Sequence, residues 1–395
     1  MPRFDPFTGL RYGPDATDLS GVICPPYDVI DDAQRAALEA EHPANCVRLE
    51  LPQPMDGLDR YAAAAALLAQ WRRPGGPLAV DDGPAFYVYR MGFHDEAGRP
   101  RQTTGVLGAL GLEPPGTGIL PHELTTPKDK QDRLDLLRAT RTNLSPIWGL
   151  SLAGGLSALC EPPGPPDARA TADGVHHRLW RVTAGGVVDT IRDAVASAPV
   201  VIADGHHRFE VALAYQAERP GPGPQDGVLA FVVELAPEQL DVAAIHRLLS
   251  GLPADWDPMS AWNEWFDVAA TNPPDAEIGN RMAEAGALAL VTRGGTWLLR
   301  PRPELMAASA MDLDSSRLDV VVAQLPTVAV RYQHGWTNIV DAVHAGEADA
   351  GVLLRPATVA QIAEVAARRE RMPPKTTFFT PKLATGMVLR DLDDQ

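Results

Sequence analysis

The chain is short of cysteine and of long apolar runs, and each shortage excludes a class of protein. Only three cysteines occur in 395 residues (Cys24, Cys46 and Cys160), and none stands in a CxxC or Cys/His cluster. A zinc ribbon or a disulfide framework is therefore not expected. The longest aliphatic run, residues 62–69, is mostly alanine and far too short to span a membrane. With no apolar signal core in residues 1–13, we expect a cytoplasmic protein without a membrane partner.

Positive charge is also scarce. Lys and Arg number 35 against 51 Asp and Glu, a net charge of −16, which argues against bulk binding of nucleic acid. A local pocket can still hold one phosphate, so a nucleotide cofactor stays open. The chain has no GxxxxGK[ST] loop, no GxGxxG after a strand, no GxSxG elbow and no HExxH helix. P-loop enzymes, standard dinucleotide folds, α/β-hydrolases and zincins are therefore excluded.

What is present indicates a globular mixed α/β protein. Hydrophobic residues make up 45% and charged residues 22% of the chain, and the length suggests two or three domains. The apolar patterns predict strands at residues 85–91, 104–112, 199–203 and 350–354. They predict helices at 131–140, after Asp204, and at 358–369.

Residues 200–208, VVIADGHHR, form the first candidate site. A buried strand that ends in Asp-Gly and runs into a helix presents unpaired N–H groups, which attract an anion. Gly205 lets the backbone approach a ligand, and His206, His207 and Arg208 add donors to phosphate. Asp204 is suited to ligate Mg²⁺ or to take a proton. The alternative is a capped helix start with surface histidines.

Residues 119–133, ILPHELTTPKDKQDR, form the second. Glu123 is suited to remove a proton from an acceptor hydroxyl, which is typically worth about 10²–10⁴-fold in rate. Lys128 and Arg133 are candidates for phosphate binding. The alternative is an ordinary solvated loop before a helix.

Two further segments carry weaker patterns. In residues 372–382, MPPKTTFFTPK, the side chains of Lys375, Thr376 and Thr377 could hold phosphate or a zwitterionic substrate; the alternative is an edge strand with a solvated lysine. In residues 23–30, ICPPYDVI, a rigid turn could aim Asp28 into a cleft, or be structural only. We expect the His176-His177 and His246-Arg247 pairs at an interface or a pocket rim.

Together these motifs resemble two known families. Over nearly its full length the chain resembles a bacterial and archaeal family of unknown function, on the segments CPPYDVI (24–30), LPHELT to NLSPI (120–147), DGVHHRLW (173–180), IADGHHRFEVAL (202–213) and MPPKTTFFTPKLATG (372–386). Over residues 118–386 it is also similar to the free L-serine kinases of the ParB/sulfiredoxin-like superfamily. Those kinases run PHE, DGHHR and PKTT in the same order as residues 121–123, 204–208 and 374–377 here.

The second resemblance implies a fold and a set of roles. The fold would be α/β (α+β), with a ParB/sulfiredoxin-like nucleotide-binding core at 116–235 and a C-terminal α+β region at 236–395. An N-terminal α/β region at 1–115, which has no counterpart in those kinases, would be added to them. Glu123 would be the base, Asp204 a metal-linked or catalytic carboxylate, His206 a further catalytic residue, and the DGHHR turn the site of the nucleotide phosphate, with PKTT near the substrate. ATP or ADP with Mg²⁺ would be the cofactors. Phe378 and Phe379 stand where those kinases have a histidine soon after PKTT, so the acceptor can differ from serine.

Three functions follow as hypotheses. The first is a kinase that phosphorylates a small-molecule hydroxyl, for example that of free L-serine. The second is a nucleotide-binding regulatory module without transfer activity, and the third is a phosphatase that uses the same anion pocket. The kinase hypothesis predicts that Glu123, Asp204 and Thr376 line one cavity. The sequence does not decide the oligomeric state.

Overall fold

The computed structural model describes residues 1–13, 16–95, 98–123, 130–162, 164–253, 255–325 and 327–393. The chain forms two compact units. Unit 1 contains Met1–His122, Thr126–Leu240 and Pro381–Gln395, and unit 2 contains Glu123–Thr125 and Asp241–Thr380. Both units mix helices and strands, so the predicted α/β class is confirmed. No helix in the described part of the chain is long and apolar enough to cross a bilayer.

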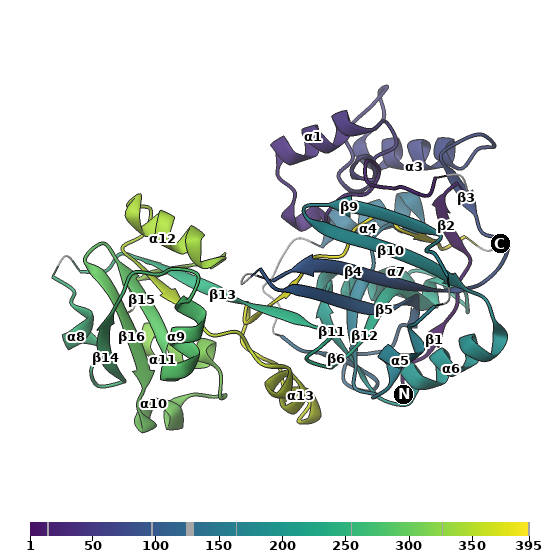
Figure 1. Cartoon of the computed structure of the whole chain (residues 1–395). Helices are drawn as coiled ribbons and strands as arrows, with labels where there is room; N and C mark the ends of the chain where they lie inside the picture. Colours follow the sequence, from purple (N-terminus) through teal and green to yellow (C-terminus); the bar gives the residue numbers. More distant parts are fainter. Residues whose placement is uncertain are drawn as a thin grey trace. The chain divides into compact units, whose positions relative to one another are not determined.

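Unit 1 is built around a large mixed sheet. Among the described residues its strands run in the order β6-β11-β8-β12-β5-β4-β10-β9, with β1 paired to β5 (Figure 1). β11 is parallel to β6 and antiparallel to β8. The strands are β1 (Phe4–Asp5), β4 (Phe86–His94), β5 (Pro100–Gly111), β6 (Ile119–Pro121), β8 (Ile147–Ser151), β9 (Ala168–Ala172), β10 (Val175–Val182), β11 (Val200–Asp204) and β12 (Gly227–Glu234).

Helices cover this sheet and bury its apolar side chains. Side chains of β5, β8, β11 and β12 share one core cluster with side chains of α5, α6 and the start of α7. The helices of unit 1 are α1 (Asp32–Glu41), α2 (Val47–Glu50), α3 (Arg60–Trp71), α4 (Gln131–Thr140), α5 (Leu156–Leu159), α6 (Gly185–Ala196) and α7 (His206–Ala217), with 3-10 turns at Tyr27–Val29 and Pro224–Asp226. Because burying one large aliphatic side chain is worth about 1.5–3 kcal/mol, this core holds β11 and α7 in place.

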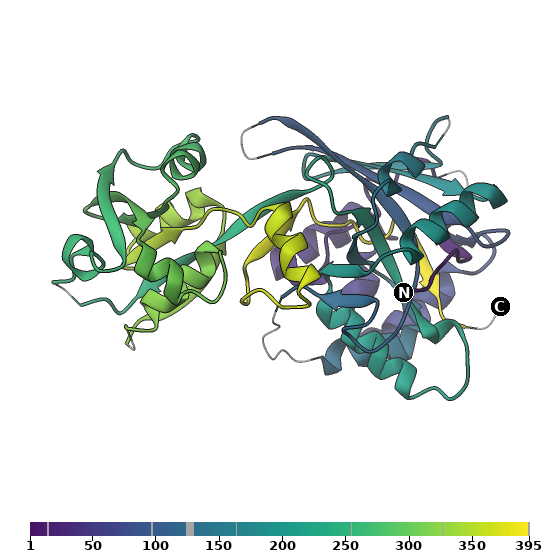
Figure 2. The same ribbon diagram turned by 90° about the horizontal axis from the view of Figure 1, so that it is seen from below.

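A small second sheet ties the two ends of the chain into unit 1. Its order is β3-β2-β20-β7, and it comprises β2 (Gly9–Tyr12), β3 (Leu78–Val80), β7 (Thr142–Asn143) and β20 (Leu389–Asp391). β20 pairs antiparallel with β2, and Figure 2 shows the yellow end of the chain beside its purple beginning. The last segment of the chain is therefore part of unit 1, although it follows unit 2 in sequence.

Unit 2 has its own sheet and its own core. The sheet runs β14-β16-β15-β18-β13-β17, with β19 also paired to β13, and α12 packs on β13, β15 and β18 (Figure 1). Its strands are β13 (Asp241–Ser250), β14 (Phe266–Thr271), β15 (Leu288–Thr292), β16 (Gly295–Pro301), β17 (Ala329–His334), β18 (Ala350–Leu353) and β19 (Thr377–Thr380). Its helices are α8 (Pro258–Ala261), α9 (Ile278–Ala285), α10 (Pro303–Ala308), α11 (Asp314–Val322), α12 (Trp336–His344) and α13 (Val359–Ala367).

The contacts divide the chain differently from the three regions expected from sequence. The division at 240/241 lies close to the expected boundary at 235/236. Residues 1–115 and 116–235, by contrast, share one sheet, because β5 pairs with β12 along most of its length. The N-terminal region is therefore built into unit 1.

Candidate functional site

The turn between β11 and α7 carries the Asp-Gly-His-His-Arg motif. Residues 200–203 are buried, so the strand is apolar on both faces, and it ends at Asp204. Gly205 has φ of +88°, in the left-handed region that glycine adopts without strain, and α7 begins at His206. A Cβ at Gly205 would also lie 3.0 Å from Cγ2 of Ile147. The turn requires glycine for its conformation, and the close approach of Ile147 also disfavours any larger residue at this position.

The carboxylate of Asp204 lies between two cationic side chains. Lys382 Nζ donates to Oδ1 at 2.8 Å, and Arg208 Nη2 donates to Oδ2 at 2.8 Å. The side chains of Asp204, Lys382 and Arg208 are 22%, 18% and 11% exposed. Burial alone would raise the pKa of Asp204, but the charges of Lys382 and Arg208 outweigh it and hold that pKa well below its usual range. Asp204 is therefore an anion at neutral pH, which favours an ion-pair or metal-ligand role over proton uptake.

Lys382 is a functional candidate that the sequence patterns did not single out. It stands at the end of the MPPKTTFFTPK segment, 178 residues from Asp204, whereas the sequence pattern drew attention to Lys375. The one available signal was a second Pro-Lys pair in that segment. Because Pro381 starts the last part of unit 1, Lys382 belongs to the same unit as Asp204.

A small pocket in unit 1 joins two predicted phosphate-binding residues to the N-terminal motif. Arg133 and Arg208 both line this pocket of about 60 Å³, together with Tyr27 and Glu50. The guanidinium of Arg133 lies 4.4 Å from the centre of the Tyr27 ring, and its Nη1 donates to the main-chain oxygen of Glu50 at 2.8 Å. Such a volume holds a few water molecules or one small polar group. The CPPYDVI segment thus forms a 3-10 turn and also lines this pocket.

Three histidines lie at the turn between β11 and α7. His122 is buried, and its Nδ1 lies 2.6 Å from the main-chain oxygen of Ile202. Since a carbonyl oxygen only accepts, Nδ1 of His122 carries a proton. The rings of His122 and His206 are 5.1 Å apart. Nε2 of His207 is buried and has no hydrogen-bond partner among the described residues, which makes it a candidate to contact a ligand.

In unit 2, Glu123 meets the PKTT segment. Its Oε1 accepts from the N–H of Lys375 at 2.6 Å, and its Oε2 accepts from the N–H groups of Thr376 at 3.1 Å and Thr377 at 3.4 Å. Lys375 has φ of +57°, and this left-handed residue turns successive N–H groups to one side, as in anion-binding nests. The PHE and PKTT motifs, 252 residues apart in sequence, therefore come together. The side chain of Lys375 itself is exposed.

A serine that sequence patterns did not predict lies beside the PKTT segment. Thr376 is buried and donates its hydroxyl proton to the main-chain oxygen of Pro373 at 2.8 Å. The hydroxyl of Ser315, 3.0 Å from that of Thr376, is then the donor of this second bond. Ser315 belongs to the first turn of α11, where residues 314–317 are polar yet buried. An Asp-Ser-Ser-Arg run that opens a helix is the signal that could have marked it.

The predicted site residues fall in both units. Asp204, His206, Arg208 and Arg133 belong to unit 1, and Glu123 belongs to unit 2 with residues 375–377. Lys128 lies outside the described residues. The prediction that Glu123, Asp204 and Thr376 line a single cavity stays a prediction.

In the two pairs expected at an interface or a pocket rim, His177, His246 and Arg247 are buried, whereas His176 is exposed. His177 is buried, with Nδ1 2.7 Å from the hydroxyl of Tyr89. His246 is buried too, and its Nδ1 accepts from the N–H of Leu354 at 3.1 Å. Burial lowers the pKa of His177 and of His246 to about 4. The pocket-rim alternative is therefore wrong for His177 and His246, and the interface alternative stays a prediction. In the described part of the chain, no group of three or more His, Cys, Asp or Glu side chains is placed to hold a metal ion.

Fold and geometry together define the class: a mixed α/β protein in which a buried strand delivers an ion-paired carboxylate to a helix start. The chain belongs to the family described as "Protein of unknown function (DUF1015)", whose model matches residues 4–325. No curated protein matches it.

Several solved structures are similar at low identity. A free serine kinase in complex with AMP is 14% identical, with a TM-score of 0.37, over 68% of this chain and 89% of its own. A conserved hypothetical protein from Pyrococcus furiosus is 13% identical, with a TM-score of 0.36, over 68% and 92%. SbnI from Staphylococcus aureus, with a C-terminal truncation, is 10% identical, with a TM-score of 0.41, over 73% and 90%.

Proposed function

We propose that this protein is a nucleotide-dependent phosphotransferase that moves a phosphoryl group from ATP or ADP to the hydroxyl of a small molecule, with free L-serine the first acceptor to test. The observation that carries the proposal is the group of Asp204, Lys382 and Arg208 at the start of α7. The order of the PHE, DGHHR and PKTT motifs, which the chain shares with the free L-serine kinases, supports the same function.

The start of α7 offers what a phosphate needs. The first N–H groups of a helix lack intrahelical partners, and the helix dipole adds positive potential. Arg208 is charged, because Asp204 and other nearby acids outweigh the effect of burial and raise its pKa. Lys382 adds a second cation, and Nε2 of His207 adds a buried nitrogen without a described partner. Phosphoryl transfer depends mainly on such positioning and charge compensation.

Mg²⁺ fits this site as a partner of the nucleotide. Mg²⁺ is commonly held by one or two carboxylates together with substrate phosphates. Asp204 supplies one ionised carboxylate, and each of its oxygens retains a lone pair beside its bond to Lys382 or Arg208. Bound with the nucleotide, Mg²⁺ would neutralise phosphate charge, while Asp204 would orient it.

Glu123 has two alternative roles in transfer, and they place different demands on its hydrogen bonds. As a base it accepts the proton of the acceptor hydroxyl, and one of its oxygens must then exchange a backbone N–H for that hydroxyl. As a clamp it only holds residues 375–377 in place. The existing hydrogen bonds also favour a second candidate function, a nucleotide-binding regulatory module, in which Glu123 is a clamp alone.

Phosphorus NMR tests the proposal directly. Purified protein is incubated with Mg²⁺, ATP or ADP, and L-serine, and then with a pool of other hydroxyl metabolites. We expect a new phosphomonoester signal with the wild type. Asp204→Asn should lower the kcat/KM of this transfer by at least about 10²-fold. The matched control is Asp189→Asn, whose side chain is 67% exposed on α6. If the nucleotide binds but stays intact with every acceptor, the regulatory module is favoured. If a phosphorylated metabolite releases phosphate when no nucleotide is present, a phosphatase is favoured.

Glu123→Gln separates the base from the clamp. Because Nε2 of glutamine donates and cannot accept, amide hydrogen exchange of residues 375–377 should become faster in either role. If Glu123 is the base, kcat also falls at least about 10²-fold while nucleotide affinity stays. A clamp alone predicts the faster exchange without a fall in kcat of this size. Turnover near that of the wild type would remove Glu123 from the base role.

A further inference from the structure

A cavity of about 460 Å³ lies within unit 2, and it shares no lining residue with the contacts of Glu123 or with the pocket of unit 1. Its walls come from the end of α9, from β16, α10, the start of α11, and the segment between β18 and α13. A volume of this size is typical of sites for small metabolites. The lining residues are Ala285, Gly286, Arg300, Pro301, Met306, Asp312, Leu313, Asp314, Arg317, Arg355, Thr358 and Gln361.

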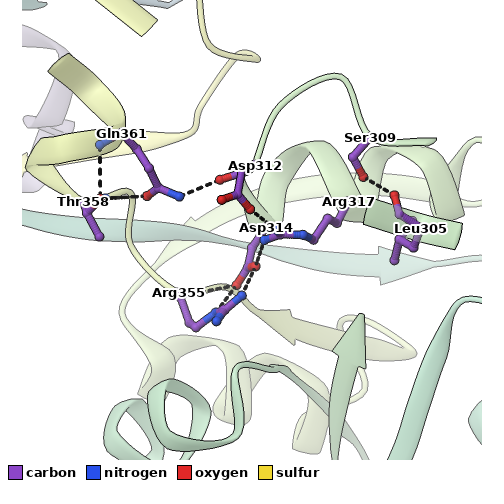
Figure 3. A network of polar contacts seen from close by, with 8 residues as sticks. All are labelled: Leu305, Ser309, Asp312, Asp314, Arg317, Arg355, Thr358 and Gln361. Atoms are coloured by element: carbon purple, nitrogen blue, oxygen red, sulfur yellow. Dashed lines mark hydrogen bonds and ion pairs between the residues drawn. The ribbon is translucent and has the colours of Figure 1, made fainter. Parts of the chain in front are cut away.

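The lining of this cavity carries a small net positive charge, because Arg317 and Arg355 pair with Asp312 and Asp314 while Arg300 has no carboxylate partner among the described residues. Three arginines line it against two aspartates, in a chain whose net charge is −16. Figure 3 shows Arg355 and Arg317 converging on Asp314. The side chain of Asp314 is 2% exposed, and it accepts from Arg355 Nη2 at 2.6 Å and from Arg317 Nη1 at 2.9 Å. One buried carboxylate therefore holds two guanidinium groups in fixed positions at the wall.

These arginines keep donors that no described residue uses. Arg300 is exposed, and its Nε donates to the main-chain oxygen of Ala285 at 3.0 Å, while its two terminal nitrogens have no partner among the described residues. Arg317 is only 6% exposed, and its buried Nε also has no hydrogen-bond partner among the described residues. A network that served only to join α11 to the segment before α13 would need Arg355 and Asp314 but not Arg300.

The remaining walls limit the kind of ligand. Met306, Leu313 and Pro301 add an apolar surface. Gln361 donates to the main-chain oxygen of Asp312 at 2.5 Å and completes a capping box with Thr358 at the start of α13 (Figure 3). Guanidinium groups bind planar carboxylates and phosphates by paired hydrogen bonds. We infer that this cavity binds a small organic anion, a carboxylate or phosphate group on an apolar or neutral body, with Arg300 as its charge-binding residue.

Isothermal titration calorimetry on the full chain tests the inference without reference to any enzymatic activity. The probes are citrate and glycerol 3-phosphate, with sorbitol as an uncharged control. We expect at least one of the two anions, and not sorbitol, to bind with an affinity that falls as salt is added. Arg300→Ala should weaken that binding at least about tenfold, because it removes a charge-assisted hydrogen bond. The matched control is Arg293→Ala, on the exposed turn between β15 and β16, which should bind as the wild type does.

Two results overturn the inference. One is the absence of any heat of binding with both anions at millimolar concentration. The other is binding that Arg300→Ala leaves unchanged, since an anion held in unit 1 would not depend on this residue. Because neither result involves phosphoryl transfer, a failure here is distinct from a failure of the proposed function.

Discussion

Lys382→Met is the most informative single change, because it removes one of the two cations that hold Asp204. The methionine keeps most of the length of the lysine stem but leaves Oδ1 of Asp204 without its 2.8 Å partner. A hydrogen bond to a charged group is worth about 1.5–3 kcal/mol, and an uncompensated buried charge costs more. Here Arg208 still donates to Oδ2, and about a fifth of the side chain of Asp204 and of Lys382 is exposed. We therefore expect the free energy of unfolding of unit 1 to fall by about 1–3 kcal/mol at pH 7.

The loss should depend on pH in a definite direction. The pKa of Asp204 is lower in the folded protein than in the unfolded chain, where an aspartate titrates near about 4. The stability that its partners supply is present above the unfolded pKa and disappears as the pH falls through the folded pKa. The difference between the wild type and Lys382→Met should accordingly be full at pH 7 and shrink below about pH 4.

The measurement has to resolve unit 1 from unit 2. Urea unfolding supplies the free energy, and hydrogen exchange of the amides of α7 assigns it to unit 1. A double-mutant cycle with Asp204→Asn isolates the pair, and its coupling energy should be about 1–3 kcal/mol. A coupling energy near zero, or a loss that is the same at low and neutral pH, would refute the account of the Asp204 ion pair.

Two other changes test the glycine turn and a buried histidine. Gly205→Ala should lower the free energy of unfolding by about 1–2 kcal/mol, because φ is +88° and the new Cβ would lie 3.0 Å from Ile147; unchanged urea unfolding would mean that the turn relaxes freely. His177 should contribute stability above its unfolded pKa of about 6.5 that is lost as the pH falls toward about 4, since burial favours its neutral form. His177→Gln should flatten the pH dependence of unfolding over this range, and an unaltered slope would contradict the assignment.

Local sequence patterns predicted the elements around the site closely. The helix predicted at 131–140 is α4, with the same bounds, and the strand predicted at 199–203 is β11, one residue later. The helix predicted at 358–369 is α13, which ends two residues sooner, with Thr358 as its N-cap. These elements follow from side chains within a few residues of one another, so periodicity and capping suffice to find them.

The partners of the site residues could not be predicted in this way. Nothing near Asp204 in sequence indicates that Lys382 would bind it, and nothing near Thr376 indicates Ser315. The sequence favours a structural turn for the CPPYDVI segment, whereas in the structure Tyr27 of this segment also lies against Arg133. Each of these contacts joins segments that sequence separates widely, and sheet pairing and packing decide which of them meet.

The amino-acid sequence alone therefore determines the α/β class, the strand that ends in Asp204, the glycine turn and the charged start of α7, because each depends on short-range conformational preferences. The tertiary structure decides that the chain returns to unit 1 after residue 380, which brings Lys382 to Asp204, and that residues 375–377 face Glu123. It also decides that three arginines from separate elements share one cavity of unit 2. The charged side chains of these sites meet because the burial of apolar surface fixes the path of the backbone, and the backbone sets the position of each side chain.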